Sequence, residues 1–183
     1  MNREQALQLV KEKIQNKNLI KHCLAVEICM KELAEHFNED KQEWALAGLL
    51  HDIDYEETKD DPEKHSIIGS QELKEKGLSK EICEAVKTHN EMHGIEPQTK
   101  MGKALLCVDP MTGLIVASTL VLPSKKIQDL TTENILNRYK ENSFARGANR
   151  EIIAKCSDIG LSLEEFSEKC LKAMQSISDD LGL

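Results

Sequence analysis

The fold is decided by an apolar run that ends in two polar residues: Trp44-Ala45-Leu46-Ala47-Gly48-Leu49-Leu50-His51-Asp52. The first seven residues are apolar on every side, which predicts a helix buried within a bundle and not one at a surface. The C-terminus of such a helix would bring His51 and Asp52 into the interior. Burial of an unpaired polar group costs about 1 to 3 kcal/mol, so we expect partners for both side chains.

Helical periodicity extends to both sides of this run. Leu7, Val10 and Ile14 outline a first helix, and a stripe of apolar residues from Leu19 to Phe37 has steps of three and four. No alternating apolar run and no Asn-Gly hairpin signal separates the apolar segments. The sequence therefore predicts an all-α fold, a bundle of helices.

Two further predicted helices carry histidines. The first begins at Asp61-Pro62, which are typical of an N-cap and first helical position, ends at Gly77, and has His65 in its first turn. Ser79 caps the second helix, on which His89 shares a face with apolar residues. We therefore expect His89 to point inward.

Two long helices are predicted in the C-terminal half. Thr99 opens one of them, and Pro110, which lacks a backbone N–H, should kink or end it before the apolar residues 114–122 resume it. The capping box Ser162-Leu163-Glu164-Glu165 opens a final helix whose apolar side runs to Leu181.

Length and charge limit the classes of partner. At 183 residues the chain fits one domain, 1–183, that buries about 70% of its unfolded surface. A net charge of -8 and an aromatic share of 3% argue against a nucleic acid polymer as partner. Residues 100–155 nevertheless carry nine Lys or Arg against five Asp or Glu, which could attract a small phosphorylated substrate. The alternative is that these charges form ordinary solvated faces.

Cysteine usage and hydropathy predict a cytoplasmic protein with no membrane partner. The six cysteines form no C-x-x-C pair, and most have apolar neighbours, so we expect reduced core residues. The N-terminal residues lack the apolar segment of a secretion signal, and no segment approaches the ~20 apolar residues of a membrane span. The oligomeric state stays open.

Six potential metal ligands occur in a particular order along the predicted helices. They are His22, His51, Asp52, His65, His89 and Asp109. The order resembles the HD superfamily of metal-dependent phosphohydrolases, in particular its small members with six such ligands, and the resemblance covers residues 19–122. Residues 123–183 would then form a C-terminal helical extension. A donor set of imidazoles and carboxylates without a thiolate favours Mn²⁺, Fe²⁺, Co²⁺ or Ni²⁺ over a closed structural zinc site, and Mg²⁺ is a further candidate.

The resemblance implies two metal ions. His22, His51, Asp52 and Asp109 would hold one ion, and His65 and His89 would hold a second that Asp52 bridges. Metals about 3.5 to 4 Å apart can activate a water as hydroxide and polarise a phosphoryl oxygen. The function implied is hydrolysis of a phosphate ester or anhydride of a small molecule, and we expect a nucleotide or dinucleotide polyphosphate as the substrate. On the residues alone, Asp109 could merely end a helix, and His65 could face solvent.

The reaction also needs acid–base and phosphate-binding groups. The catalytic candidates are Asp52, Asp54 and Glu56. Asp54 and Glu56 could donate a proton or orient a water. Arginines four residues apart can clamp a phosphate. The candidates for substrate binding are Lys103, Lys125, Lys126, Arg146, Arg150 and, if its helix persists, His93. Many HD proteins have glycine where this chain has Asp54, a difference that affects the expected loop geometry and substrate contacts but not the ligands. No Gly-Tyr-Pro motif follows, so cyclic-dinucleotide hydrolysis is not supported.

Two other functions are compatible with the ligand set. A few HD relatives are diiron oxygenases, but they share a lysine soon after the His-Asp pair, where this chain has Asp54-Tyr55-Glu56-Glu57. A non-catalytic, nucleotide-sensing module is the third possibility, because a shared fold does not guarantee a shared function.

Overall fold

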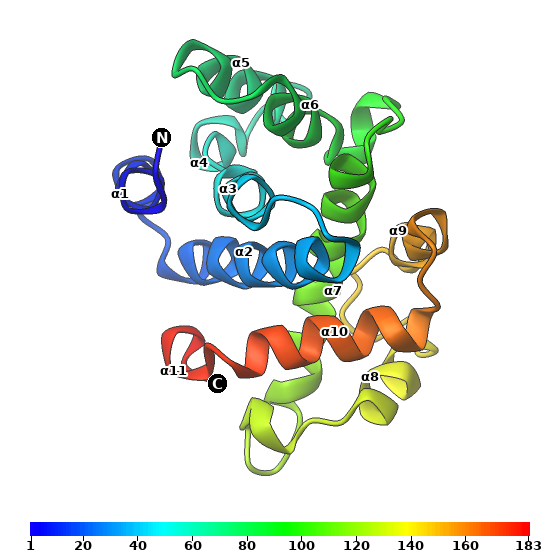
Figure 1. Cartoon of the computed structure of the whole chain (residues 1–183). Coiled ribbons are helices and arrows are strands. Elements are labelled where there is room, and N and C mark those ends of the chain that lie inside the picture. Colours follow the sequence, from blue (N-terminus) through cyan, green and yellow to red (C-terminus); the bar gives the residue numbers. More distant parts are fainter.

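The structure is a computed structural model that describes all 183 residues. It consists of helices joined by turns and loops and has no strand, which confirms the all-α prediction. The α-helices are α1 (Arg3–Lys13), α2 (Lys17–Phe37), α3 (Lys41–Leu50), α4 (Tyr55–Thr58), α5 (Ile67–Glu75), α6 (Lys80–Thr88), α7 (Lys100–Leu120), α8 (Thr132–Tyr139), α9 (Arg150–Ala154), α10 (Leu163–Gln175) and α11 (Ser178–Leu181) (Figure 1). Three short 3-10 helices are η1 (Glu91–His93), η2 (Ile127–Asp129) and η3 (Lys155–Ile159).

Helices α2 and α7 form the centre of the bundle. Helix α2 packs against α3 on one side and against α10 and α11 on the other, while α7 crosses behind it (Figure 1). Helices α5 and α6 pair with each other, and α6 packs on both α3 and α7. One hydrophobic core of 43 buried residues includes side chains from Ala6 to Leu181, so the C-terminal helices share the core of the N-terminal ones.

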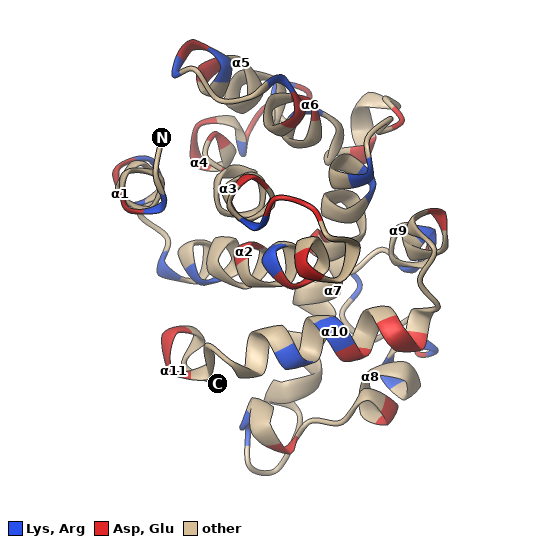
Figure 2. Cartoon of the chain, in the orientation of Figure 1, with Lys and Arg blue, Asp and Glu red and all other residues tan.

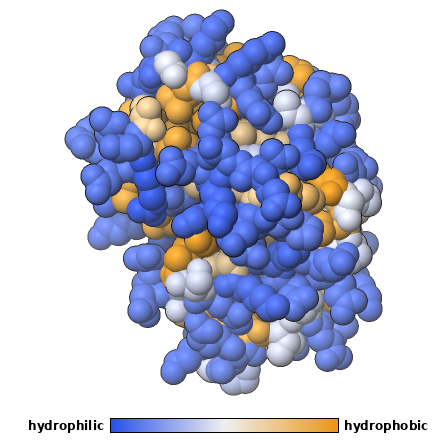
Figure 3. Space-filling view, viewed as in Figure 1, coloured by the Kyte–Doolittle hydropathy of each residue, from blue (hydrophilic) through white to orange (hydrophobic).

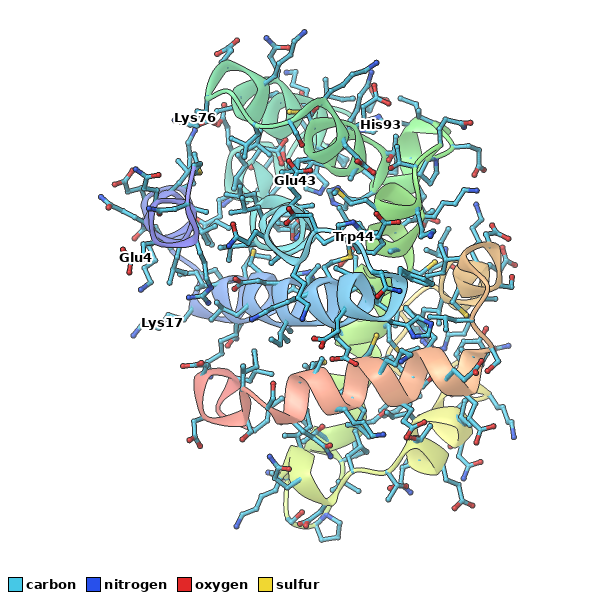
Figure 4. The ribbon with its side chains drawn as sticks, in the orientation of Figure 1. Glu4, Lys17, Glu43, Trp44, Lys76 and His93 are labelled. Carbon is cyan, nitrogen blue, oxygen red and sulfur yellow. The ribbon has the colours of Figure 1, made fainter.

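Helix α3 is buried as predicted. Leu49 and Leu50 are fully buried, and Trp44 lies inside the bundle near α2 and α7 (Figure 4). Gly48 makes this packing possible, because a Cβ atom there would lie 2.8 Å from the carbonyl oxygen of Val26 in α2. The absence of a side chain therefore lets the backbones of α2 and α3 approach closely.

Local capping signals identified three helix starts correctly. The hydroxyl of Ser79 accepts a hydrogen bond from the backbone N–H of Ile82, and Thr99 does the same for Gly102. Ser162 forms the predicted capping box with Glu165. Such caps satisfy backbone donors that a helix leaves free at its N-terminus.

Three helix boundaries differ from the prediction. Helix α5 begins only at Ile67, because the left-handed backbone of Ser66 (φ 70°) breaks the helix, so His65 lies in a turn before it. Helix α7 continues through Pro110, where close packing of its neighbours outweighs one missing hydrogen bond. Helix α10 ends at Gln175, whose side chain donates to the carbonyls of Ile127 and Leu130, and α11 is separate.

Helix α7 also departs from the hydropathy expectation. By length and composition alone, its 21 residues could cross a membrane. However, 61% of its most apolar window is buried inside the protein, as is typical of a core helix. The apolar character of α7 is therefore explained by its place at the centre of the bundle (Figure 1).

Lysine, arginine, aspartate and glutamate residues are dispersed along the outer helices (Figure 2). The face shown in Figure 3 is mostly hydrophilic, with small apolar patches between the charged residues. Glu4, Lys17 and Lys76 extend from the periphery of the bundle (Figure 4). The six cysteines are all buried, and none forms a disulfide.

The contact at Gly48 gives a stability prediction. Gly48→Ala should lower the free energy of unfolding by about 1 to 3 kcal/mol, because the new methyl group would press on the backbone of α2. Gly113→Ala is the matched control: Gly113 is also inside a helix, but its Cβ would meet nothing within 4 Å. The control should be neutral or stabilising, by up to about 1 kcal/mol. Urea unfolding measures both, and equal stability of the two variants would contradict the prediction.

Candidate metal centre

The fold brings the six predicted ligands to one place. His22 comes from α2 and Asp109 from α7, while His51 and His89 are the C-cap residues of α3 and α6. Asp52 and His65 lie in the turns after α3 and before α5. Helix ends and turns therefore supply four of the six side chains, and the two central helices supply the others.

The carboxylate of Asp52 lies between two pairs of imidazoles. Its Oδ2 atom is 3.8 Å from Nε2 of His22 and 3.4 Å from Nε2 of His51. Its Oδ1 atom is 3.3 Å from Nε2 of His65 and 3.4 Å from Nε2 of His89. Each carboxylate oxygen thus faces one pair of histidines.

Asp109 belongs to the first of these pairs. Its Oδ1 atom is 3.0 Å from Nε2 of His22 and 3.9 Å from Nε2 of His51. The donor atoms of His22, His51 and Asp109 all lie within 4.8 Å of one another, and so do those of His51, Asp52 and His89. Both groups have the size and chemistry of a site that could hold a divalent metal.

Backbone carbonyls orient the two helix-terminal histidines. Nδ1 of His51 donates to the carbonyl of Gly48 (2.8 Å), and Nδ1 of His89 donates to the carbonyl of Val86 (2.6 Å). In each case the acceptor is three residues earlier in the same helix. Because the proton is on Nδ1, the lone pair of Nε2 is left to face Asp52.

His22 is oriented by a side chain from α7. The hydroxyl of Thr112 donates to the carbonyl of Asp109 (2.9 Å) and accepts from Nδ1 of His22 (3.1 Å). A hydroxyl has a single proton, so its bond to the carbonyl determines that it accepts from the imidazole. Thr112 therefore directs Nε2 of His22 toward the centre.

His65 is oriented by Asp54. Nδ1 of His65 donates to Oδ1 of Asp54 (2.9 Å), and the backbone N–H of Gly69 donates to Oδ2 (2.7 Å). A Cβ at Gly69 would lie 3.1 Å from the carboxyl carbon, so glycine allows α5 to approach Asp54 closely. Hydrogen bonds to the second nitrogen of a histidine are typical of metal ligands.

The protonation of the cluster reflects its geometry. Burial lowers the pKa of His51 to about 4. Burial would also lower the pKa of His65, but its hydrogen bonds and charge interactions with Asp52 and Asp54 raise it to about 10. Burial would raise the pKa of Asp52, but the surrounding imidazoles hold it well below its usual value. Asp52 is therefore ionised, as a metal ligand must be.

Solvent reaches the centre from the side of His22 and Asp109. Their side chains are 23% and 33% exposed, whereas those of His51 and His89 are 0% and 2% exposed. A cavity of about 190 Å³ adjoins Asp109, His65 and His89. Its other walls include Asn90 and Glu91 at the start of η1, and Gly147, Asn149 and Ile152 around the start of α9.

Two predicted catalytic residues have other roles. The side chain of Asp54 is fully buried and holds His65, so Asp54 positions a ligand and does not reach water. The carboxylate of Glu56 accepts hydrogen bonds from the backbone N–H groups of Gln15 (2.7 Å) and Asn16 (2.6 Å). The side chain of Glu56 thus connects to the turn between α1 and α2.

Arg150 is likewise a structural residue. Its guanidinium donates to six backbone carbonyls, so it cannot clamp a phosphate with a second arginine. These acceptors lie between Arg138 and Ala148, so Arg150 fixes the loop that leads to the cavity wall. Arg146 is exposed in this loop and precedes the cavity residue Gly147.

The remaining predicted substrate-binding residues lie outside the ligand cluster. Nε2 of His93 donates to the carbonyl of His65 (2.7 Å), and His93 belongs to η1 instead of continuing α6 (Figure 4). Lys103 is partly buried in α7. Helix α7 ends about 16 Å along its axis from Asp109, and Lys125 and Lys126 lie beyond that end.

Three residues that position the ligands were not predicted. Thr112 orients His22, as described above, and its only sequence signal is its place one turn after Asp109. The hydroxyl of Ser66 donates to the carbonyl of Lys87, which ties the turn containing His65 to α6. The amide of Asn90 donates to the carbonyl of His65 (3.3 Å).

The Asp54–His65 hydrogen bond leads to a prediction. Asp54→Asn should weaken metal binding by about 10- to 100-fold, because the neutral amide orients His65 poorly. The same substitution should lower the pKa of His65 from about 10 in the metal-free protein, as measured by NMR titration. Asp60→Asn, an exposed neighbour, is the control and should change neither property. Unaltered metal affinity in Asp54→Asn would show that this contact does not support the site.

Metal binding should become stronger as the pH rises. Because the pKa of His65 is about 10, a metal must displace a proton from its imidazole at neutral pH. The apparent binding constant should therefore rise about tenfold per pH unit for each displaced proton, until the pH approaches that pKa. Calorimetry between pH 6 and pH 9 measures this slope, and an affinity independent of pH would contradict it.

Comparisons with known proteins agree with this geometry. Residues 19–138 match the family model for the HD domain. The chain is also similar to the Ribonuclease Y of Oleidesulfovibrio alaskensis, with 28% identity over 142 residues, and to that of Lawsonia intracellularis, with 27% identity over 138 residues. The Ribonuclease Y of Alkaliphilus metalliredigens is 30% identical over 141 residues.

These relatives are much longer than the chain. The matched regions cover 75%, 74% and 74% of this chain but only 27%, 26% and 29% of the respective relatives. The HD match, in contrast, covers more than half of the chain and includes all six clustered side chains. The chain therefore belongs to the HD domain family.

Proposed function

We propose that the protein is a metal-dependent phosphohydrolase that acts on a small phosphorylated molecule. The observation that carries this proposal is the place of the Asp52 carboxylate, with each oxygen facing a separate pair of imidazoles. Membership of the HD domain family supports metal-dependent phosphohydrolase chemistry in general.

The cluster has enough donors for two metal ions. His22, His51 and Asp109 would hold one ion together with Oδ2 of Asp52, and His65 and His89 would hold the second with Oδ1. The donor set suits Mn²⁺, Fe²⁺, Co²⁺, Ni²⁺ or Mg²⁺. Bound metals would supply activation of water and polarisation of a phosphoryl oxygen.

The protein's own residues hold the donors and control access to them. Thr112 and Asp54 orient His22 and His65 from outside the cluster, so these ligands need little reorganisation when a substrate binds. The buried side of the centre, at His51 and His89, excludes water. A substrate must therefore approach over His22 and Asp109, the most exposed ligands.

The cavity beside the ligands favours a small reacting group. Its volume of about 190 Å³ is below the roughly 300 to 1,000 Å³ of pockets that enclose a drug-sized ligand. It therefore suits a phosphoryl group with a few further atoms. A nucleotide or dinucleotide polyphosphate in the cytoplasm remains our proposal for the substrate, with most of its structure outside this cavity.

RNA is a second candidate substrate. The similar proteins are ribonucleases by name, and the similarity extends over 75% of this chain for the first of them. The net charge of -8 and the aromatic share of 3% disfavour a polyanionic strand, which basic grooves and aromatic platforms usually bind. We therefore place the small phosphorylated molecule first.

Phosphate release after metal loading tests the proposed function. The protein loaded separately with each of the five metals should hydrolyse members of a panel of phosphate monoesters, nucleotides and dinucleotide polyphosphates, and chelation should abolish the activity. Asp52→Asn should reduce the rate by at least about 100-fold, because Asp52 is shared by both donor groups. The exposed Asp129→Asn is the control and should retain activity.

Other results of the same assays would contradict the proposal. Cleavage of single-stranded RNA without hydrolysis of the small-molecule panel would favour the second candidate. Oxygen consumption with substrate in place of phosphate release would indicate a diiron oxygenase. If the protein binds nucleotides without turnover, and the double variant His51→Ala, Asp52→Ala binds them with unchanged affinity, the protein is a sensor.

A further inference from the structure

A second cavity adjoins the metal centre at His22. Its volume is about 480 Å³, and it lies between α2, α7 and residues 181–183. Helix α11 packs on α2, close to the N-terminal half of α2 in Figure 1. His22 and Thr112, which belong to the metal centre and its support, form part of the lining. We refer to this cavity as the α2–α7 groove.

Small side chains create the α2–α7 groove. Ala25 of α2 and Gly113 and Ala117 of α7 line it, and a Cβ placed on Gly113 would meet nothing within 4 Å. The residues of α7 in the lining recur at helical spacing from Thr112 to Leu120, so one face of the helix forms the wall. The groove is therefore an open space and not a packed interface between helices.

The α2–α7 groove differs in character from the cavity beside His65. It is larger, and half of its lining residues are hydrophobic, compared with two of ten in the smaller cavity. Asp109 lines the smaller cavity and His22 lines the groove, and the partly exposed side chains of these two residues are 3.0 Å apart. A phosphoryl group at the ligands can therefore have its ester substituent in the groove.

Lys21 gives the α2–α7 groove a positive charge. Its ammonium group forms no ion pair within 4.0 Å, and it lies beside the backbone of Gly182, where a Cβ would be 2.7 Å from Nζ. Lys21 is the only lysine or arginine in the lining, and no carboxylate side chain accompanies it. The groove thus combines apolar walls with one cationic side chain.

We propose that the α2–α7 groove binds the apolar organic group of the phosphorylated substrate. This inference rests on the proposed function and narrows it: among small phosphorylated molecules, phosphate esters with an aromatic or other compact apolar substituent take precedence over nucleotide polyphosphates. Ala25, Gly113 and Ala117 determine the room for this substituent, and His22 connects the groove to the reacting group.

Two phosphonates that cannot be hydrolysed test the proposal. Phenylphosphonate and methylphosphonate share the anionic head group and differ in the apolar substituent. Calorimetry on the metal-loaded, full-length chain should show that phenylphosphonate binds about 10- to 100-fold more tightly, as expected when an aromatic ring is buried. Equal affinities for the two phosphonates would overturn the proposal.

A filled groove provides the second arm of the test. Ala117→Leu should reduce the ratio of the two affinities to near one, while the affinity for methylphosphonate and the bound metal stay unchanged. Ala154→Leu adds the same atoms to an exposed site on α9 and should preserve the ratio. If Ala117→Leu binds metal but also preserves the ratio, the apolar group does not lie in the groove.

Failure of this inference is distinguishable from failure of the proposed function. The ratio of affinities depends on binding and not on turnover. If the protein hydrolyses phosphate esters but shows no preference for phenylphosphonate, only the proposed role of the groove is contradicted. If the protein hydrolyses no phosphate ester but prefers phenylphosphonate, and Ala117→Leu removes this preference, the proposed function is contradicted. The groove then remains a ligand site.

Discussion

The carboxylate of Asp52 is the feature on which the centre of this molecule depends. Four imidazole nitrogens lie 3.3 to 3.8 Å from its two oxygens, and nearly all of these groups are shielded from bulk water. So many polar groups can share the interior only if each forms a hydrogen bond, pairs with an opposite charge or binds a metal. Helices α2, α3, α6 and α7 meet where this requirement is satisfied.

The segments that follow the ligand-bearing helices contribute the surroundings of the centre. Gly147, Asn149 and Ile152 line one cavity, and residues 181–183 line the other. The loop before α9 keeps its shape because the Arg150 guanidinium binds its backbone carbonyls. The long α7 links both regions, because it carries Asp109 and Thr112 at its middle and a wall of the groove beyond them.

The sequence predicted features that depend on local interactions. Helical periodicity and caps such as Ser79 and Thr99 involve residues at most four positions apart, so the all-α fold could be predicted. The roles of Glu56 and Arg150 could not, because Glu56 binds backbone groups about 40 positions earlier and Arg150 binds a folded loop. The order of the ligands suggested that they converge. The orienting contact between Thr112 and His22 spans 90 positions, and the place of Thr112 one turn after Asp109 was too weak a signal to predict it.

Anomalous X-ray diffraction from crystals of the metal-loaded protein, recorded on both sides of the metal absorption edge, tests the central claim most directly. Two peaks are expected, one on each side of the Asp52 carboxylate, at bonding distances of about 2.0 to 2.2 Å from their histidine nitrogens. One peak should adjoin His22, His51 and Asp109, and the other His65 and His89. A single peak, or metal bound away from Asp52, would contradict a centre built around a shared carboxylate.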